Sequence, residues 1–315
     1  MAGFDEAYRC IFIGNPAKLS LKNNLFCITQ ENKDITFPLR DILLVISESK
    51  HVSITTSLLS KLADNKIAFF TCDDSHTPNG IFTPYLGYYK TSEMLQNQIA
   101  FSKQNKAILW QQIIKQKLYN QAMLATAFCP KRGQKILELS KAVVLNDAKN
   151  FESQGAILYF QALFGNKFSR KDCNPINAAL NYAYAIIRGC VARSLVSSGL
   201  LPAFGIFHKN QFNAFNLADD MLEPYRVFAD SLVCLMVEKQ ELIEGFQRKH
   251  RQNLVGVLNA KIACKDRHYP MYRAITRSVQ SLANVLRGFE NQLVLPVFIK
   301  ENSDGREVYE NFSDV

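Results

Sequence analysis

The stretch SEMLQNQIAFSKQNKAILWQQIIKQKLYNQAMLATAFC, residues 92–129, decides the fold class, because it separates a strand-rich part of the chain from a helical part. It belongs to a segment that has neither glycine nor proline between Gly87 and Pro130, and these two residues most often interrupt helices. Its apolar residues recur at helical spacing, among them Leu95, Ile99, Leu109, Ile113 and Leu124. The pattern predicts one long helix, or two helices joined near residues 103–106.

Upstream of this stretch, residues 1 to about 85 favour β-strands. The short segments YRCIFIG, LSLKNNLFCIT, DITFPL, DILLVIS and KIAFFTC are rich in β-branched and aromatic residues. Asparagine tolerates positive φ, so Asn23 and Asn24 predict a hairpin turn inside the second segment. Apolar spacing over Leu58–Ala63 predicts one helix between the last two segments.

Downstream, further helices are predicted for residues 134–144, 217–244, about 250–262 and 270–287. Another would run from a cap at Asn146 or Asp147 to Gly165. One more would start at Asn174 as the cap, with Pro175 in the first helical position. We therefore expect an α+β protein: a small β-rich N-terminal domain over residues 1–88, then a larger all-α catalytic domain over 89–315.

Composition excludes several classes of protein. With 48% apolar and 21% charged residues, the chain is typical of a soluble globular protein, and no apolar run reaches the roughly 18 residues of a membrane span. The N-terminal residues do not resemble a secretory signal. The eight cysteines are scattered without a CxxC pair, which favours reduced thiols in a cytoplasmic protein and argues against structural zinc.

The net charge of +9 is concentrated in one segment. Residues 248–277 hold eight Lys or Arg against one acid, a net +7, whereas residues 216–244 hold seven acids against two bases, a net −5. An acidic segment beside a basic one is what a metal-dependent enzyme acting on polyanions would carry. Two solvated helix faces would give the same pattern.

The acidic segment follows an unusual loop in GIFHKNQFNAFNLADDMLEPYR, residues 205–226. Asp219 and Asp220 lie four and three residues before Glu223, a spacing that brings carboxylates together on one helical face. Pro224 places Glu223 at a helix start or a kink. His208 fits no amphipathic period, so it is a candidate ligand beside these carboxylates. Helix capping is the alternative explanation for the acids.

A third ligand is expected from Glu152, which borders a stripe of apolar residues beside Gly155 and Ala156. Small neighbours leave room for an ion and a phosphate. An ion pair with Arg188 or Arg193 is the alternative, because a buried carboxylate needs a positive partner. One imidazole nitrogen with carboxylate oxygens suits Mg²⁺ or Mn²⁺.

Motifs of other enzyme classes (GxSxG, GxGxxG and the P-loop) do not occur in the sequence. Basic residues would bind the phosphate groups of a phosphodiester substrate. Such contacts position DNA but do not recognise its sequence. The candidates are Arg248, Lys249, Arg251, Lys265, Arg267, Arg273 and Arg277.

Four motifs in this order resemble one family. They are ExxxAxxYF from Glu152, NPINAALNYAYAIIR (174–188), GIFH (205–208) and LADDMLEPYRVFAD (217–230), and the upstream IIKQKLYNQ (113–121) fits the same family pattern. Together they resemble the CRISPR-associated protein one family, the integrases of CRISPR adaptation, over most of the chain.

The resemblance implies metal ligands at Glu152, His208 and Glu223. It implies a supporting or second-ion carboxylate at Asp220, and it implies that Arg226 and Asp230 hold the ligands in place or stabilise the fold. It also implies a homodimeric, metal-dependent DNA endonuclease and integrase of the prokaryotic cytoplasm. Two such dimers would flank a dimer of the small CRISPR-associated protein two and join DNA fragments to a CRISPR repeat. The sequence as a whole resembles those members of the family that are found beside a Cas9-type effector. Two alternatives stay open: a non-catalytic DNA-binding scaffold, and a stand-alone nuclease for branched DNA in repair.

Overall fold

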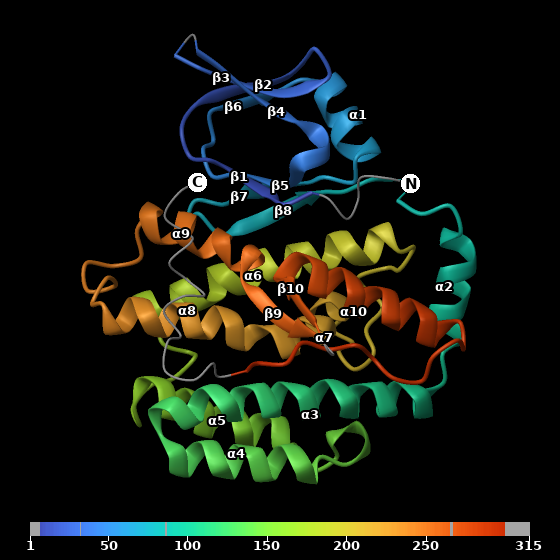
Figure 1. Ribbon diagram of the computed structural model, residues 1–315, viewed down its shortest axis with the longest axis vertical. Helices are drawn as coiled ribbons and strands as arrows, with labels where there is room; N and C mark the ends of the chain where they lie inside the picture. The colour runs from blue at the N-terminus through green and yellow to red at the C-terminus, as the bar shows by residue number, and fades with distance from the viewer. Residues whose placement is uncertain (1–6, 32, 86, 265–266, 300–315) are drawn as a thin grey trace.

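The computed structural model describes residues 7–31, 33–85, 87–264 and 267–299. Two small sheets lie at one end of the molecule and a larger group of helices fills the rest (Figure 1). This arrangement confirms the α+β class, with strands first and helices after them.

The strand-rich part consists of two four-stranded sheets and one helix. The first sheet has the order β1-β5-β7-β8, with β8 antiparallel to β7 and the other pairs parallel. The second has the order β4-β3-β2-β6. The bounds are β1 Arg9–Ile13, β2 Ala17–Lys22, β3 Leu25–Gln30, β4 Lys33–Pro38, β5 Ile42–Ser47, β6 Val52–Ile54, α1 Thr56–Asp64, β7 Ala68–Cys72 and β8 Pro78–Phe82.

Local sequence explains the hairpin between β2 and β3. Asn23 and Asn24 adopt φ angles of 51° and 59°, the left-handed region that asparagine tolerates best after glycine. The tight turn joins β2 to β3 in antiparallel register, with Lys22 opposite Leu25. The predicted hairpin is confirmed.

The first sheet is covered on both faces, which is why all six residues of β5 are buried. On one face it packs with the second sheet and with Leu58 and Leu62 of α1. On the other, side chains such as Phe70 join the core of the helical part. A Cβ atom at Gly189 would collide with the Phe70 ring, so this glycine lets a helix approach the sheet closely. Since the two parts share one core, the boundary at residues 88 and 89 stays a prediction.

The helices are α2 Thr91–Ala100, α3 Lys103–Phe128, α4 Pro130–Ala142, α5 Phe151–Phe164, α6 Pro175–Ser197, α7 Asn216–Leu222, α8 Arg226–Glu238, α9 Arg248–Val255 and α10 Met271–Leu286. The stretch 92–129 forms two helices, α2 and α3, separated at Phe101 and Ser102. The segment predicted as one helix over residues 217–244 is also divided, into α7 and α8, and it ends at Glu238.

The helical part also contains a two-stranded antiparallel sheet, β9 Lys261–Cys264 and β10 Arg267–Pro270, which the sequence analysis did not predict. Ala263 forms a further bridge to Val297 near the end of the described chain. None of the described helices has the length and apolarity to cross a membrane.

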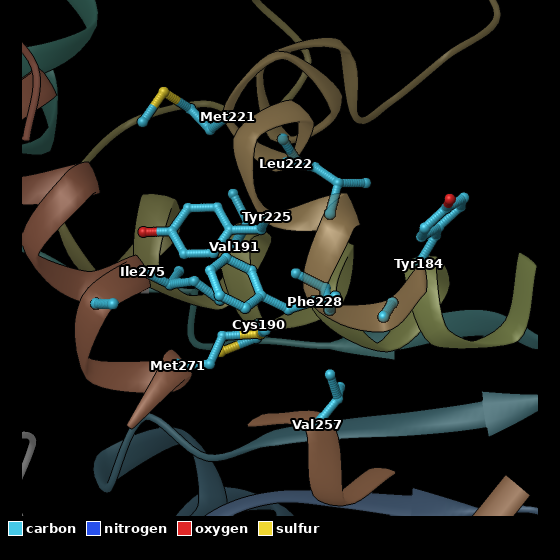
Figure 2. Packing of buried hydrophobic residues seen from close by; sticks show 14 of the residues in the cluster. Tyr184, Cys190, Val191, Met221, Leu222, Tyr225, Phe228, Val257, Met271 and Ile275 are labelled. Carbon is cyan, nitrogen blue, oxygen red and sulfur yellow. The ribbon is translucent and has the colours of Figure 1, made fainter. Parts of the chain in front are cut away.

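Helix α6 is the centre of the helical core. Cys190 and Val191 on α6 pack with Tyr225, Phe228 and Met271 from the elements around it (Figure 2). On the other side of α7 and α8 lies α3, which also contacts α4 and α5. The candidate site lies where α3, α5 and the junction of α7 with α8 meet.

Candidate functional site

Glu152 lies in the first turn of α5, and a carboxylate outside the helix fixes this turn. Asp147 accepts hydrogen bonds from the backbone N–H groups of Phe151 (2.9 Å) and Glu152 (3.0 Å). These amides lack partners within the helix, and the helix dipole stabilises a negative charge at this end. The predicted helix start at Asn146 or Asp147 is therefore wrong by several residues: the N-cap residue is Asn150 and the helix begins at Phe151, while the Asp147 side chain reaches its first amides from outside.

Close packing of α5 on α3 sets the position of Glu152. A Cβ atom at Gly155 would collide with the side chain of Leu118, so this glycine permits the approach of the two helices. Gly155 thus serves helix packing and does not leave space for an ion. As a result Glu152 meets Lys117 on α3, with Oε1 2.6 Å from Nζ.

The loop that carries His208 is folded around the carboxylate of Asp220. Oδ2 of Asp220 accepts hydrogen bonds from the backbone N–H groups of Ile206 (2.6 Å) and Phe207 (3.0 Å). Oδ1 accepts one from the N–H of His208 (3.2 Å) and lies 2.6 Å from its Nδ1. Asp220 is fully buried. With both oxygens used, Asp220 has the geometry of a supporting carboxylate and not of a ligand to a second ion.

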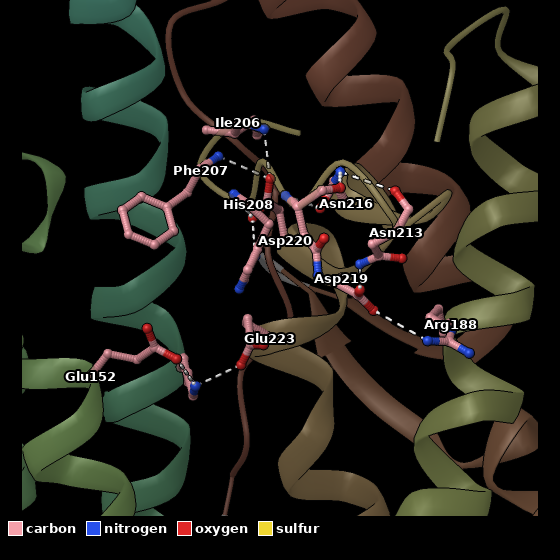
Figure 3. Close-up of polar contacts among 12 residues, drawn as sticks. Glu152, Arg188, Ile206, Phe207, His208, Asn213, Asn216, Asp219, Asp220 and Glu223 are labelled. Atoms are coloured by element: carbon pink, nitrogen blue, oxygen red, sulfur yellow. Dashed lines mark hydrogen bonds and ion pairs between the residues drawn. The ribbon is translucent and has the colours of Figure 1, made fainter. Parts of the chain in front are cut away.

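Asp220 also determines how the imidazole of His208 is presented. The hydrogen bond to Asp220 raises the pKa of His208 above its ordinary value, more than partial burial lowers it. Because Nδ1 faces Asp220, Nε2 is left for another partner. In Figure 3 the ring extends away from Asp220 toward the space between Glu152 and Glu223. This is the orientation that metal-binding histidines take when a carboxylate holds their other nitrogen.

The same loop is closed by Asn216 and Asp219. The amide group of Asn216 donates hydrogen bonds to the carbonyl oxygens of Ala203, Asn210 and Asn213. Asp219 accepts a hydrogen bond from Asn213 (2.7 Å) and lies 3.9 Å from Arg188. Asp219, Asp220 and Glu223 therefore face three different sets of partners (Figure 3), although their spacing predicted that they would share one face.

Glu223 lies at the junction between α7 and α8, where Pro224 interrupts regular helix. Residues Glu223–Tyr225 form a 3-10 turn, η3, as the sequence predicted for a kink. The carbonyl oxygen of Pro224 accepts a hydrogen bond from Asn120 of α3 (2.9 Å), which ties the kink to that helix. The Glu223 side chain is buried. It points toward α3 and Glu152 (Figure 3).

Two cations balance Glu223. Oε1 accepts a hydrogen bond from Arg226 (3.0 Å), and Oε2 lies 2.6 Å from Lys117 Nζ. Burial opposes ionisation of this carboxyl group, but Arg226 and Lys117 outweigh it and hold the pKa of Glu223 at about 2. Burial likewise works against the charge of Lys117, and Glu223 and Glu152 still raise its pKa above the ordinary value.

Lys117 is the residue that sequence reasoning missed. The positive partner that Glu152 requires is this lysine, and neither Arg188 nor Arg193. The signal was available, since Lys117 lies four residues after Ile113 on the apolar stripe of the long helix. A lysine on a buried face needs an acidic partner.

The donors fit a hard divalent ion in their chemistry. An imidazole Nε2 and carboxylate oxygens of Glu152 and Glu223 suit Mg²⁺ or Mn²⁺. Glu223 Oε2 accepts no regular hydrogen bond, although Lys117 Nζ is near it. Within the described residues no three His, Cys, Asp or Glu side chains are close enough to form a metal-binding group. The ammonium of Lys117 fills the space between the two carboxylates instead.

A second buried network connects α5, which carries Glu152, with α6 and with α8, which begins three residues after Glu223. Asp230 of α8 is fully buried and accepts hydrogen bonds from Tyr159 of α5 and Tyr184 of α6. Burial raises the pKa of Asp230 to about 6, against the lowering effect of the two hydroxyl groups. Arg226 stacks over the ring of Tyr184, 4.5 Å from its centre. Asp230 and Arg226 are therefore structural supports for the site.

The predicted DNA-binding residues lie on other elements, and the structure separates them. Arg251 of α9 is buried and forms an ion pair with Glu48, which follows β5. It therefore links the helical part to the strand-rich part and is not available to DNA in this arrangement. Arg248 is exposed and donates a hydrogen bond to Asn15.

The remaining basic candidates differ in exposure. Lys249 on α9, Arg267 on β10 and Arg277 on α10 are exposed, and Arg273 on α10 is half-buried. Arg277 lies over the ring of Tyr269, 4.7 Å from its centre. Lys265 falls outside the described residues.

Comparison with known proteins gives one family. The family model described as "CRISPR associated protein Cas1" matches residues 11–262. A CRISPR-associated endonuclease Cas1 from Neisseria meningitidis is 40% identical over 291 residues, which cover 92% of this chain and 96% of the relative.

Two solved structures share the fold of this chain. A casposase bound to integration product aligns with a TM-score of 0.74 at 17% identity, covering 98% of this chain and 100% of that one. A Cas6-RT-Cas1–Cas2 complex aligns over 94% of this chain and 36% of its own, with a TM-score of 0.74 at 16% identity. Family model, relative and fold agree, and the chain belongs to the Cas1 family.

Proposed function

We propose that this chain is a metal-dependent DNA endonuclease and integrase that inserts captured DNA fragments into a CRISPR array. The observation that carries the proposal is that the side chains of His208, Glu152 and Glu223, from three separate segments, face one space beside α3 (Figure 3), where Lys117 lies 2.6 Å from each of the two glutamates. Membership of the Cas1 family and the fold shared with a casposase bound to integration product support it.

The metal site would consist of Nε2 of His208 and the carboxylates of Glu152 and Glu223. A divalent ion bound there would supply Lewis-acid polarisation of a phosphodiester group. Asp220 holds the imidazole of His208 in one orientation through Nδ1 (2.6 Å). Arg226 keeps Glu223 ionised and fixes its Oε1, which leaves Oε2 to face the site.

The reaction would be a transesterification. The 3′-hydroxyl oxygen of the incoming DNA attacks a phosphorus atom in the repeat, the bond from phosphorus to the repeat's own 3′ oxygen breaks, and that oxygen leaves with a proton. When water replaces the DNA hydroxyl, the same steps give hydrolysis, which accounts for endonuclease activity. The protein contributes orientation and charge through His208, Glu152 and Glu223 and through the residues that hold them.

DNA would be held by exposed basic residues through phosphate contacts. Arg248, Lys249, Arg267 and Arg277 meet this requirement, with Arg273 and Lys265 as further candidates. Each such contact releases counterions, so DNA affinity would fall steeply with salt concentration. Arg251 does not meet this requirement, because its guanidinium group is paired with Glu48 in the interior.

We further propose that the chain acts as a homodimer with a dimer of the small Cas2 protein in the prokaryotic cytoplasm. The fold shared with a Cas6-RT-Cas1–Cas2 complex supports the partnership. A Cas9-type effector is a further proposed partner.

A plasmid strand-transfer assay tests the proposal. A short DNA duplex and a repeat-containing plasmid are incubated with the protein and Cas2, in Mn²⁺, Mg²⁺ or chelator. We expect joining that requires the metal and is lost in Glu152→Ala, His208→Ala and Glu223→Ala, each with an unchanged circular dichroism spectrum. Binding without joining or cutting in any metal would leave a DNA-binding scaffold. Cutting of branched DNA without repeat-dependent joining would indicate a repair nuclease.

A further inference from the structure

Lys117 occupies the centre of the candidate site. Its Nζ lies 2.6 Å from Oε1 of Glu152 and 2.6 Å from Oε2 of Glu223. The lysine side chain is only 7% exposed, and that of Glu223 is 5% exposed. One ammonium group thus joins α5 to the junction of α7 and α8, two elements that supply the proposed metal ligands.

In the protein without metal, the ammonium group of Lys117 is needed to balance the charges of Glu152 and Glu223. Arg226 compensates Glu223 only through Oε1, 3.0 Å away, and Glu152 has Lys117 as its ion-pair partner. If Lys117 were neutral, two facing carboxylates would share the charge of one arginine in a water-poor environment. Isolated buried charges are costly, and removing one partner of a buried pair is strongly destabilising.

The same oxygens are the ones that a divalent ion would use. Mg²⁺ bonds carboxylate oxygens at about 2.0–2.1 Å, and an ammonium group between the same two oxygens would be a positive charge within the ion's own coordination shell. Two cations cannot both occupy this space without strong repulsion. The lysine stem is flexible, so the ammonium group can move while its Cα stays in α3.

We infer that Lys117 is a built-in substitute cation: it balances Glu152 and Glu223 in the metal-free protein and releases at least one of them when a divalent ion binds. The inference rests on the proposed function, because it requires an ion at this point. It makes Lys117 a positioning residue that keeps two ligands within reach of each other before metal arrives. It also lowers the apparent metal affinity, since binding must displace the ammonium group.

Mn²⁺ binding to the full-length protein tests this inference without reference to activity. Free Mn²⁺ is measured by electron paramagnetic resonance during titration of wild type, Lys117→Met and Lys115→Met. Lys115 is an exposed lysine on the same helix, two residues away, and serves as the matched control. We expect Lys117→Met to bind Mn²⁺ about tenfold more tightly than wild type, because no ammonium group has to be displaced, whereas Lys115→Met binds as wild type does.

Thermal melting provides the second readout. In chelator, Lys117→Met should have a lower melting temperature than wild type. Saturating Mn²⁺ should raise the melting temperature of Lys117→Met by more than it raises that of wild type. If Lys117→Met does not fold, Lys117→Gln removes the charge while keeping hydrogen-bond donors, and the same tightening is expected. Adding Glu223→Gln to either variant should abolish the gain, which places the ion at this site.

The possible failures are distinguishable. Mn²⁺ affinity in Lys117→Met and Lys117→Gln that equals wild type or is weaker would overturn the role of Lys117 as a competing cation, while the proposed metal site would stand. Absence of any Mn²⁺ binding that depends on Glu223, in wild type and in the Lys117 variants, would overturn this inference and the metal-dependent function together.

Discussion

Replacing Asp220 by asparagine isolates the contribution of the carboxylate that organises the histidine loop. Its two oxygens accept four N–H groups, at 2.6, 3.0, 3.2 and 2.6 Å. An asparagine has one oxygen and one NH₂ group, so in either orientation about two of the four donors would face another donor. Leaving a buried donor without a partner costs about 1–3 kcal/mol, and relaxation of the loop recovers part of it. We therefore expect Asp220→Asn to lose about 2–4 kcal/mol of folding free energy.

The melting temperature of Asp220→Asn should fall by roughly 3–6 °C, on an unfolding entropy of about 2.1 cal/mol/K per residue. Because His208 also loses its fixed orientation, Mn²⁺ affinity or strand transfer should drop about 10–100-fold, as for other residues that orient a metal ligand. Differential scanning calorimetry and Mn²⁺ titration measure the two effects. Asp219→Asn is the matched control one residue earlier, with only Asn213 and a 3.9 Å contact to Arg188 to lose. If Asp220→Asn melted, bound Mn²⁺ and joined DNA as Asp219→Asn does, the orienting role of Asp220 would be refuted.

Other parts of the structure give further predictions. Tyr159→Phe removes one of the two hydroxyl groups that bond buried Asp230, so it should cost about 1.5–3 kcal/mol in a urea-unfolding experiment at pH 7, and a wild-type midpoint would contradict this. The pKa of Asp230 is raised from 3.8 to about 6, so its contribution to stability is fully present below pH 3.8 and lost as pH rises through 6. This component should vanish from the pH profile in Asp230→Asn. Arg251→Ala breaks the buried pair with Glu48 and should destabilise the fold by about 3–5 kcal/mol without changing the salt dependence of DNA binding. Lys249→Ala should do the opposite, reducing the slope of log affinity against log salt by about one unit at unchanged stability.

Sequence reasoning was most successful where local chemistry decides the structure. Two consecutive asparagines fixed the β2–β3 hairpin, and Asn174 with Pro175 set the start of α6, where the Asn174 side chain accepts a hydrogen bond from Asn177. The kink at Pro224 follows from the missing amide hydrogen of proline. Each of these features depends on a few neighbouring residues.

Features that depend on distant contacts were not predictable in the same way. The β9–β10 pair contains polar and charged residues without clear alternation, and Ala263 of β9 forms a bridge to Val297, 34 positions away. Arg251 is one of several bases in a basic segment, and only the fold reveals Glu48 beside it. The ion pairs of Lys117 likewise join residues 35 and 106 positions apart.

At the candidate site, too, local sequence identified some features and distant contacts determined the others. Residue types and spacing singled out His208, Asp220 and Glu223, but they did not separate a supporting carboxylate from a ligand. That distinction came from the four donors around Asp220 and from the direction of the imidazole ring. Resemblance to a family supplied the ligand set, and the geometry supplied a physical role for each neighbour.

Locating a bound ion tests the central claim most directly. Crystals of the full-length protein grown with Mn²⁺ and measured at the manganese absorption edge would show the metal by its anomalous signal. We expect a peak within bonding distance of His208 Nε2 and of carboxylate oxygens of Glu152 and Glu223. A fully occupied peak elsewhere, or no peak at this point in Mn²⁺ concentrations that support strand transfer, would contradict it.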